Sequence, residues 1–163
     1  MPFTPVYLRN AWVRLKVTSG GTFKQYSCQV KRFALMPEPG EEVTVRTLCD
    51  DGSYTEIGAT TWTLEMDGLQ GWGTTDGLSR FLFDNRGAAA TFEVDQYGEA
   101  HTPTAEEPGF TGSCRLVPGP YGGEVDTYAE FEVVLPVSGE PVLVVAAWPV
   151  ATGLEGEPEP EAA

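Results

Sequence analysis

The sequence predicts a mainly β domain with one helix, and three observations support this class. The chain has 163 residues, of which 41% are hydrophobic and 11% aromatic, so it is long enough for one domain with a core. Its 19 glycines and 13 prolines predict many turns, which favours β-structure over a helical bundle. Apolar and polar residues alternate in most segments between these turns, and a single segment has helical periodicity.

The first element is expected near the N-terminus. Residues 12–17, WVRLKV, alternate apolar side chains with two basic ones, which predicts a half-buried strand with a basic outer face. Residues 19–21, SGG, predict a turn, and residues 26–35 are expected to return as the hairpin partner of this strand. The residues expected to point inward from the partner strand are Cys28, Val30 and Phe33.

A long interruption follows at about residues 36–60. Pro37, Pro39 and Gly40 break the alternation, and only residues 43–48 have the character of a strand. Segments of this length without regular structure are usually functional or disordered in compact domains. The sequence therefore predicts a long loop at this position.

A strand and the single helix come next. In residues 61–67 the apolar side chains fall on one face, which predicts a strand. Residues 78–82 place apolar side chains at i, i+3 and i+4, which predicts a flanking helix over about residues 76–86. Its expected caps are Thr75 or Asp76 at the start and Gly87 at the end.

The glycine-rich segment GLQGWGTT joins that strand to the helix. Its position and its glycines are similar to those of phosphate-binding loops. Gly68 and Gly73 match the spacing of a P-loop, but Thr74 stands where the phosphate-binding lysine is required. Asp76 occupies the third glycine position of a dinucleotide fingerprint and would repel a phosphate. The segment is therefore predicted to be a plain connection, and its Trp72 has no assigned contact.

Four strands are expected in the remainder of the domain. Residues 90–95 and 110–116 alternate as half-buried strands, separated by a polar loop. Residues 127–137 and 142–148 are expected to form a long hairpin around a turn at Ser138-Gly139. Residues 1–149 are thus predicted to form one β domain. Residues 150–163 are acidic and proline-spaced, which predicts a disordered C-terminal tail.

Charge is unevenly distributed along the chain, whose net charge is −14. Residues 1–46 hold seven basic and three acidic residues (+4), whereas residues 47–163 hold three basic and 21 acidic residues (−18). Such a balance lacks the clustered cations that grip nucleic acid. The asymmetry would instead suit a subunit that presents unlike faces to its copies.

No enzyme constellation is evident, and we expect neither a metal nor another cofactor. His101 is the single histidine and is expected to be an exposed loop residue. Adjacent acidic residues fall in loop-like stretches, where nothing would separate their pKa values for acid-base catalysis. The three cysteines, Cys28, Cys49 and Cys114, are predicted to be free thiols. No apolar run of about 18 residues and no signal peptide is present, so no membrane partner is expected and the chain is predicted to be cytoplasmic where it is made.

The order of several segments resembles the major tail tube proteins of long, flexible-tailed (siphovirus) bacteriophages. Residues 58–87, GATTWTLEMDGLQGWGTTDGLSRFLFDNRG, are similar to that family's Trp-bearing strand, turn and helix. Residues 90–98, ATFEVDQYG, are similar to the following strand. Residues 110–141, with Tyr-Gly-Gly at 121–123 and Val-x-Gly-x-Pro at 137–141, are similar to the closing portion. The resemblance covers residues 22–141 and leaves both ends of the chain without a counterpart.

The resemblance implies a β-sandwich or partly rolled antiparallel sheet with one flanking helix, of the phage tail-tube type. It also implies hexameric rings that stack into a tube around a tape-measure protein and later conduct DNA without specific binding. The expected partners are further copies of the chain, the tape-measure protein, and the tail terminator and distal tail proteins. The expected location is the virion tail, after assembly in the host cytoplasm.

Two groups of candidate residues follow from this resemblance. The long loop would reach the adjacent ring, with candidate contacts at Glu38, Glu41, Glu42, Asp50, Asp51 and Tyr54. Polar strand faces would line the bore, with candidates Glu93, Asp95, Glu130 and Glu132. An acidic bore would let DNA slide, because duplex DNA carries about one negative charge per 1.7 Å.

Two other functions are compatible with a β domain of this size. The first is a monomeric β-sandwich that binds a ligand such as a sugar, with Trp12, Trp62 or Trp72 as an aromatic platform. The second is a small hydrolase, for which the sequence offers no nucleophile and base pair. Rings or tubes are expected for a tail tube protein but not for a monomeric binding domain or a hydrolase.

Overall fold

The computed structural model describes residues 5–8, 10–49, 52–98 and 101–148. The elements of this part of the chain are β1 (Trp12–Val17), β2 (Lys24–Gln25), β3 (Val30–Glu38), β4 (Glu42–Arg46), β5 (Ser53–Ile57), β6 (Thr61–Leu69), α1 (Leu78–Asp84), β7 (Ala89–Asp95), β8 (Gly109–Arg115) and β9 (Glu130–Val144). The predicted tail, residues 150–163, lies outside the described residues. No helix in the described part is long and apolar enough to span a bilayer.

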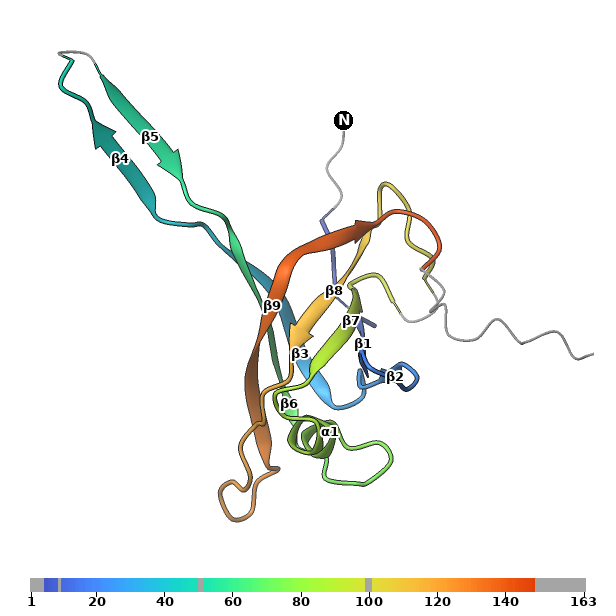
Figure 1. Ribbon diagram of the computed structural model, residues 1–163. Helices are drawn as coiled ribbons and strands as arrows, with labels where there is room; N and C mark the ends of the chain where they lie inside the picture. The colour runs from blue at the N-terminus through green and yellow to red at the C-terminus, as the bar shows by residue number, and fades with distance from the viewer. Residues whose placement is uncertain (1–4, 9, 50–51, 99–100, 149–163) are drawn as a thin grey trace, which may run out of the picture.

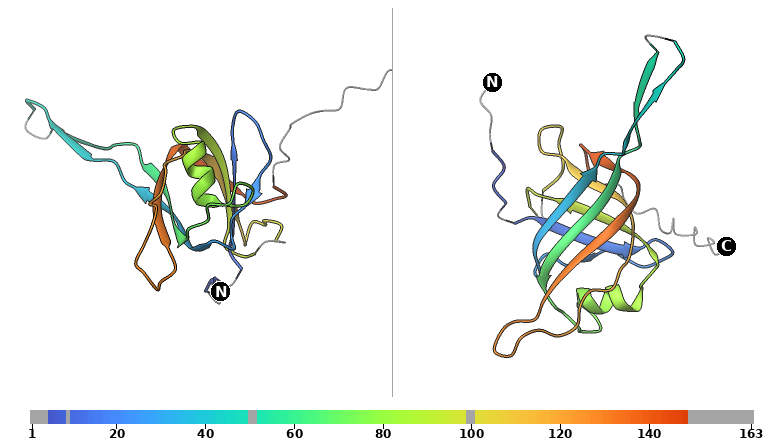
Figure 2. Two further views of the ribbon diagram at one scale, coloured as in Figure 1. Left: turned by 90° about the horizontal axis from the view of Figure 1, so that it is seen from below. Right: turned by 90° about the vertical axis from the view of Figure 1, so that its left-hand side faces the viewer.

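Seven strands form one antiparallel sheet in the order β2-β1-β7-β8-β9-β6-β3. The sheet rolls over itself, so that the layer of β3, β6 and β9 crosses in front of the layer that contains β1 (Figure 2). The core lies between these layers and includes Leu15, Leu64, Phe92 and Leu135, each with no exposed surface. The helix α1 closes one end of the roll (Figure 1). The expected class, a partly rolled antiparallel sheet with one flanking helix, is confirmed.

The strand β9 belongs to both layers. Its first half pairs with β6 from Leu69↔Glu130 to Trp62↔Val137, and its second half pairs with β8 up to Gly109↔Val144. The predicted hairpin around Ser138-Gly139 is therefore wrong. Because a partner strand lies on each side, the chain bends at Gly139, where φ is +78°, and continues forward instead of reversing.

The predicted N-terminal hairpin is also wrong. The strand β1 pairs with the two-residue β2 and with β7, whereas β3 pairs with β6 in the other layer. Between β2 and β3, Tyr26 is buried against Phe81 of the helix, with ring centroids 5.6 Å apart. This anchor directs the chain across the end of the roll. Cys28, expected to point inward, is consequently exposed, whereas Val30 and Phe33 pack against the core as expected.

The predicted long loop is a two-stranded hairpin that projects from the body (Figure 1). We refer to residues 38–57 as the arm. Every residue of β4 and β5 is exposed. The sequence indicated one strand at 43–48 but did not reveal its partner, because strand pairing gives no hydrophobic signal where neither face is buried.

The helix is shorter than expected at both ends, and its N-terminus is capped from a distant residue. Neither Thr75 nor Asp76 caps it; instead Oε1 of Gln29 accepts the N–H of Leu78 at 2.9 Å. Nε2 of the same side chain donates to the carbonyl of Asp76. A Cβ at Gly68 would overlap the Gln29 carbonyl, and one at Gly77 would overlap the carbonyls of Gly71 and Gly73, so close backbone packing requires glycine at these two positions. The segment makes room for a neighbouring strand connection and not for a phosphate.

Candidate assembly surfaces

The arm exposes an apolar face. In its ladder Val43 lies opposite Glu56 and Val45 opposite Tyr54, so these four side chains share one face. The exposed fractions of Val43, Val45 and Tyr54 are 56%, 56% and 70%. A two-stranded hairpin of this length is at best marginally stable alone in water. An exposed apolar face on a projecting hairpin is therefore typical of a surface that is covered in an assembly.

Four of the six predicted inter-ring residues lie in the described part of the arm. Glu42 lies in β4 and Tyr54 in β5, both exposed, and Glu38 ends β3 at the base of the arm. Glu41 precedes β4, and its carbonyl accepts the N–H of Gly58. The other two candidates, Asp50 and Asp51, lie outside the described residues.

The outer face of β3, β6 and β9 carries mixed charge with an excess of acid. Arg32, Asp67 and Glu132 lie side by side across the three strands. The Arg32 guanidinium lies 3.3 Å from both Glu65 and Asp67, and Lys31 pairs with Glu130 at 2.5 Å. Two of the four predicted lumen residues, Glu130 and Glu132, are thus brought together on one exposed sheet face.

The other two predicted lumen residues, Glu93 and Asp95, are covered in this chain, each 1% exposed. Glu93 pairs with Arg14, its direct neighbour on β1, and the Arg14 guanidinium lies 4.4 Å from the Trp12 ring centroid. Burial raises the pKa of Glu93, against the opposing effect of Arg14. The alternation of β7 predicted a solvent-exposed face, but the adjacent strand β1 places Trp12 and Arg14 over it. Neither carboxylate is exposed on the surface of this chain.

His101 joins two acidic residues across the loop after β7. Its Nδ1 lies 2.8 Å from Oδ2 of Asp95, and its Nε2 lies 2.9 Å from Oε2 of Glu107. The imidazole is only 17% exposed, so the expected exposed loop histidine is wrong. The hydrogen bond to Asp95 is the main cause of a raised pKa at His101, opposed by a smaller effect of burial. Because carboxylates occupy both ring nitrogens, neither nitrogen is available to activate a nucleophile.

The contacts of His101 with Asp95 and Glu107, which we call the His101 clamp, predict that the stability of the fold depends on pH. A histidine whose pKa is raised on folding stabilises the fold fully below its unfolded pKa of about 6.5, and this contribution disappears as the pH rises through the folded pKa. We expect His101→Gln to remove this part of the pH dependence, so that between pH 6 and pH 8 the free energy of unfolding falls more in the wild type than in the variant. Urea unfolding of both proteins at the two pH values measures it.

An NMR titration provides the control, because His101 is the only histidine in the chain. Its imidazole resonance should titrate above pH 6.5 in the folded protein and near that value in urea. Equal titration midpoints in the two states would contradict the clamp.

Trp72 connects the helix to the loop at residues 117–129. Its ring lies edge-on to Tyr121 and Phe83, with centroids 5.2 and 6.4 Å away. Its Nε1 donates to Oε1 of Gln70 at 3.1 Å, and Nε2 of Gln70 donates to the carbonyls of Gly122 and Glu130. Trp72 is therefore an internal contact between two surface segments. The structure assigns the residue that the sequence left without a contact.

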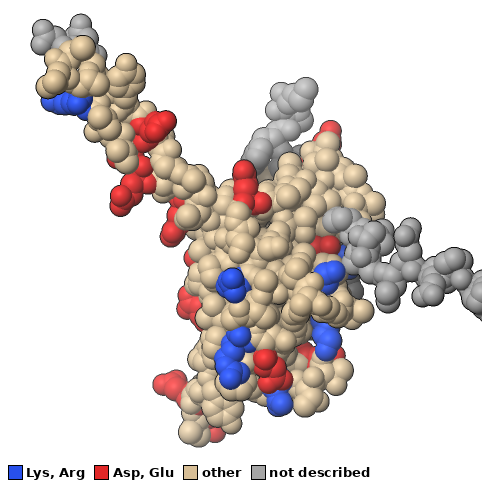
Figure 3. Space-filling view, viewed as in Figure 1, with Lys and Arg blue, Asp and Glu red and all other residues tan. Residues whose placement is uncertain are grey.

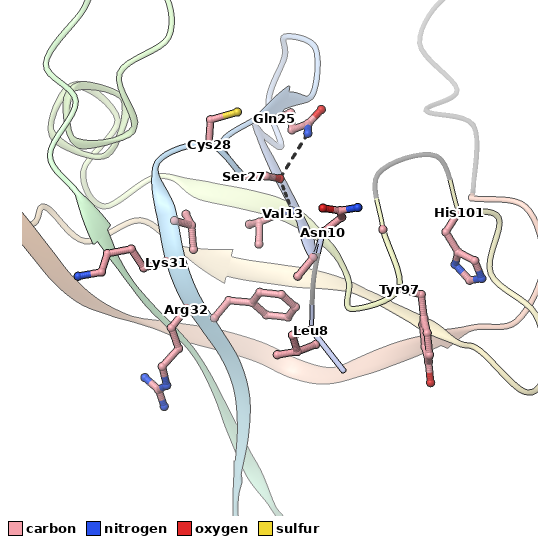
Figure 4. Close-up of a pocket in the computed structure, with 14 residues that line it drawn as sticks. Leu8, Asn10, Val13, Gln25, Ser27, Cys28, Lys31, Arg32, Tyr97 and His101 are labelled. Carbon is pink, nitrogen blue, oxygen red and sulfur yellow. Dashed lines mark hydrogen bonds between the residues drawn. The ribbon is translucent and has the colours of Figure 1, made fainter. Parts of the chain in front are cut away.

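A cavity of about 760 Å³ lies between the start of β1 and β3. In Figure 4 the side chains of Leu8 and Val13 lie between the two strands, whereas Lys31 and Arg32 point away on the other side of β3. The tryptophans are not among its lining residues. Trp12 packs instead against Trp148, with ring centroids 5.2 Å apart. The cavity therefore lacks the tryptophan platform on which the sugar-binding alternative depended, although Phe33 and Tyr97 are among its lining residues.

The described part of the chain contains no group of three or more His, Cys, Asp or Glu side chains placed to hold a metal ion. Its cysteines are free: Cys28 and Cys49 are exposed and Cys114 is buried. Burial raises the pKa of the Cys114 thiol to about 12, which keeps it protonated and unreactive.

Comparison with known proteins finds likeness in structure but not in sequence. No protein-family model and no curated protein matches the chain. A chain from the tail of an empty gene transfer agent particle, refined with C6 symmetry, is 18% identical with a TM-score of 0.57, over 82% of this chain and 95% of that one. A chain from the virion of a native gene transfer agent is 17% identical with a TM-score of 0.55, over 82% and 95%.

A third solved structure comes from a different kind of particle. A chain from the six-fold symmetrised baseplate of the anti-feeding prophage is 9% identical with a TM-score of 0.55, over 88% of this chain and 98% of that one. At such identities the comparison concerns the fold alone. The rolled sheet, its flanking helix and most of the chain length thus follow a fold found in chains of gene transfer agent and anti-feeding prophage particles.

Proposed function

We propose that this chain is a structural subunit of a phage-type tail tube, as in siphovirus tails, and that it assembles into hexameric rings that stack. The single observation that carries the proposal is the arm, an exposed hairpin with an apolar face, on a fold shared with chains of six-fold particles. Exposed apolar faces commonly mark interaction surfaces, and a neighbouring copy of the chain would cover this one.

The edges of the sheet support the ring. The strands β2 and β3 end the seven-stranded order, so each has one edge without a strand partner among the described residues. Exposed edges invite pairing, and a closed ring covers them. Six copies that each contribute several strands would close a barrel wider than the 16 to 18 strands that already leave an aqueous channel.

The bore is proposed to be lined by the outer face of β3, β6 and β9. Its exposed carboxylates, which include Glu130 and Glu132, outnumber Lys31 and Arg32. An acidic surface would repel the DNA phosphates and let the duplex slide. The tape-measure protein, the tail terminator and the distal tail proteins are the proposed further partners, in a virion tail assembled in the host cytoplasm.

Negative-stain electron microscopy of the purified full-length chain tests this function. We expect rings with a central hole, or tubes built from them, and a sedimentation coefficient that rises with protein concentration. A chain that remains a strict monomer at high concentration would contradict the proposal. Such a result would favour the alternative function, a monomeric binding domain with the cavity beside β3 as its ligand site.

A further inference from the structure

Carboxylates are concentrated on the arm, which carries six of them and one arginine, a net charge of −5. In Figure 3 acidic residues follow the arm, whereas the body below it carries both basic and acidic residues. The helix α1 lies at the end of the body opposite the arm (Figures 1 and 2). Two copies arranged head to tail would therefore place the acidic arm of one copy at the α1 end of the next.

The acidic end has a defined contact face. Glu56 shares the apolar face of the arm with Val43, Val45 and Tyr54. Glu41 precedes Val43 by two residues, and its bond to Gly58 extends the same ladder, so it continues this face toward the base of the arm. We call these five residues the arm docking face. It has an apolar centre flanked by carboxylates.

The end of the body that carries α1 has a matching surface just after the helix. Phe83 is 46% exposed, and the Arg86 guanidinium lies 4.8 Å from its ring centroid. Nη1 of Arg86 donates to the Phe83 carbonyl at 2.9 Å, and Nη1 of Arg115 donates to the Gly87 carbonyl at 3.0 Å. We call Phe83, Arg86 and Arg115 the α1-end surface. It has an exposed aromatic ring beside one guanidinium, and a second guanidinium at the backbone just after the helix.

The two arginines of this surface differ from most others in the described chain. Arg14, Arg32 and Arg80 each pair with a carboxylate of the same chain. Within the residues that the structure describes, Arg86 and Arg115 form no ion pair and donate only to backbone carbonyls. Each guanidinium has five N–H donors, so most of its hydrogen-bonding capacity remains for an incoming carboxylate.

We propose that the arm docking face of one copy packs on the α1-end surface of a second copy in the adjacent ring. The inference rests on the proposed tail-tube function and names the surface that receives the arm. Glu41 and Glu56 meet Arg86 and Arg115, while the apolar centre of the arm covers Phe83. Because the two surfaces differ, the contact is heterologous and repeats from ring to ring without closing. An extended limb over residues 39–48 reaches about 30 Å, at roughly 3.3 Å per residue.

Charge reversal with a matched control tests the contact. Glu56→Lys changes the arm docking face, whereas Thr44→Lys places a lysine on the opposite face of the arm, where Thr44 is paired with Thr55. We expect E56K to shorten tubes about tenfold at physiological salt, because a favourable charge pair becomes a like-charge contact. T44K should give tubes of wild-type length, and R86E should reproduce the defect of E56K.

The combined variant E56K/R86E restores opposite charges and should recover the tubes. Electron microscopy measures tube length, and thermal unfolding checks that each variant is folded. Equal tube lengths for E56K and T44K, or no recovery in the combined variant, would overturn this docking contact while leaving the tail-tube function intact. A wild-type chain that forms neither rings nor tubes would overturn the function and the contact together.

Discussion

Removal of the arm is expected to leave a folded chain that forms rings but no tubes. The backbones of Gly40 and Gly58 are close enough that a Cβ on Gly40 would overlap Gly58, so a two-residue Asn-Gly turn can replace residues 41–57. The body should keep its melting temperature, because the residues of β4 and β5 are fully accessible and contribute nothing to the core. Stacking should be lost, because the arm provides the proposed contact between rings. Thermal unfolding and electron microscopy measure the two effects.

A point variant separates the loss of the arm from the loss of its apolar face. Val45 and Thr44 are adjacent, both accessible, and on opposite faces of the hairpin. We expect Val45→Asp to prevent stacking and Thr44→Asp to permit it. Stacking that survives removal of the arm, or equal behaviour of the two point variants, would show that rings associate through other surfaces.

Arg14→Ala is expected to cause the largest loss of stability among single polar substitutions. The Glu93 side chain is 1% exposed, and Arg14, 26% exposed, is its ion-pair partner. Removal of one member of a buried pair leaves an uncompensated charge, which costs about 3 kcal/mol. Arg14 also contacts the Trp12 and Phe23 rings, so lost packing adds to the effect. Urea unfolding at pH 7 measures the free energy of unfolding.

The stability lost in the Arg14→Ala variant should depend on pH, which would identify the unpaired Glu93 carboxylate as its cause. Without Arg14 the pKa of Glu93 should rise further, because burial is then less opposed. A carboxyl group with a raised folded pKa is most destabilising above that pKa, and the penalty disappears as the pH falls below its unfolded value of about 4.3. The deficit should therefore be large at pH 7 and small near pH 4.

The double variant R14M/E93L is the control for the ion pair. Replacement of a whole buried pair by apolar residues is often neutral or stabilising, so this variant should regain most of the lost stability. A double variant as unstable as Arg14→Ala would indicate that packing by the Arg14 side chain, and not the unpaired charge, causes the loss.

The sequence indicated most of the individual elements of this fold. Alternation identified β1, β6, β7 and β8 within one or two residues of their observed bounds, and the i, i+3, i+4 stripe identified α1. These elements each bury one face, so their periodicity reflects the core directly. Pairing was harder to predict, because alternation reports which face is buried and not which strand lies alongside. Both predicted hairpins failed for this reason.

The candidate assembly surfaces show the same difference between features that the sequence predicts and features that depend on strand pairing. Exposure of Glu130 and Glu132 followed from their alternation with the buried Phe131 and Val133. Burial of Glu93 could not be predicted, because it depends on Arg14, which is far away in sequence and adjacent in the sheet. The apolar face of the arm had a faint signal in the alternating runs EVTVR and SYTEI. Nothing in the sequence paired those runs.

The sequence by itself determined that this chain is mainly β, has one helix and carries no recognisable catalytic motif. These properties follow from local periodicity, turn residues and composition, which act within a few residues of one another. Only the tertiary structure decided that β9 spans both layers, that Gln29 caps α1, and that the acidic arm and the arginines after α1 lie at opposite ends. Each of these depends on contacts between residues distant in sequence, whose energies appear only once the sheet has rolled and brought them together.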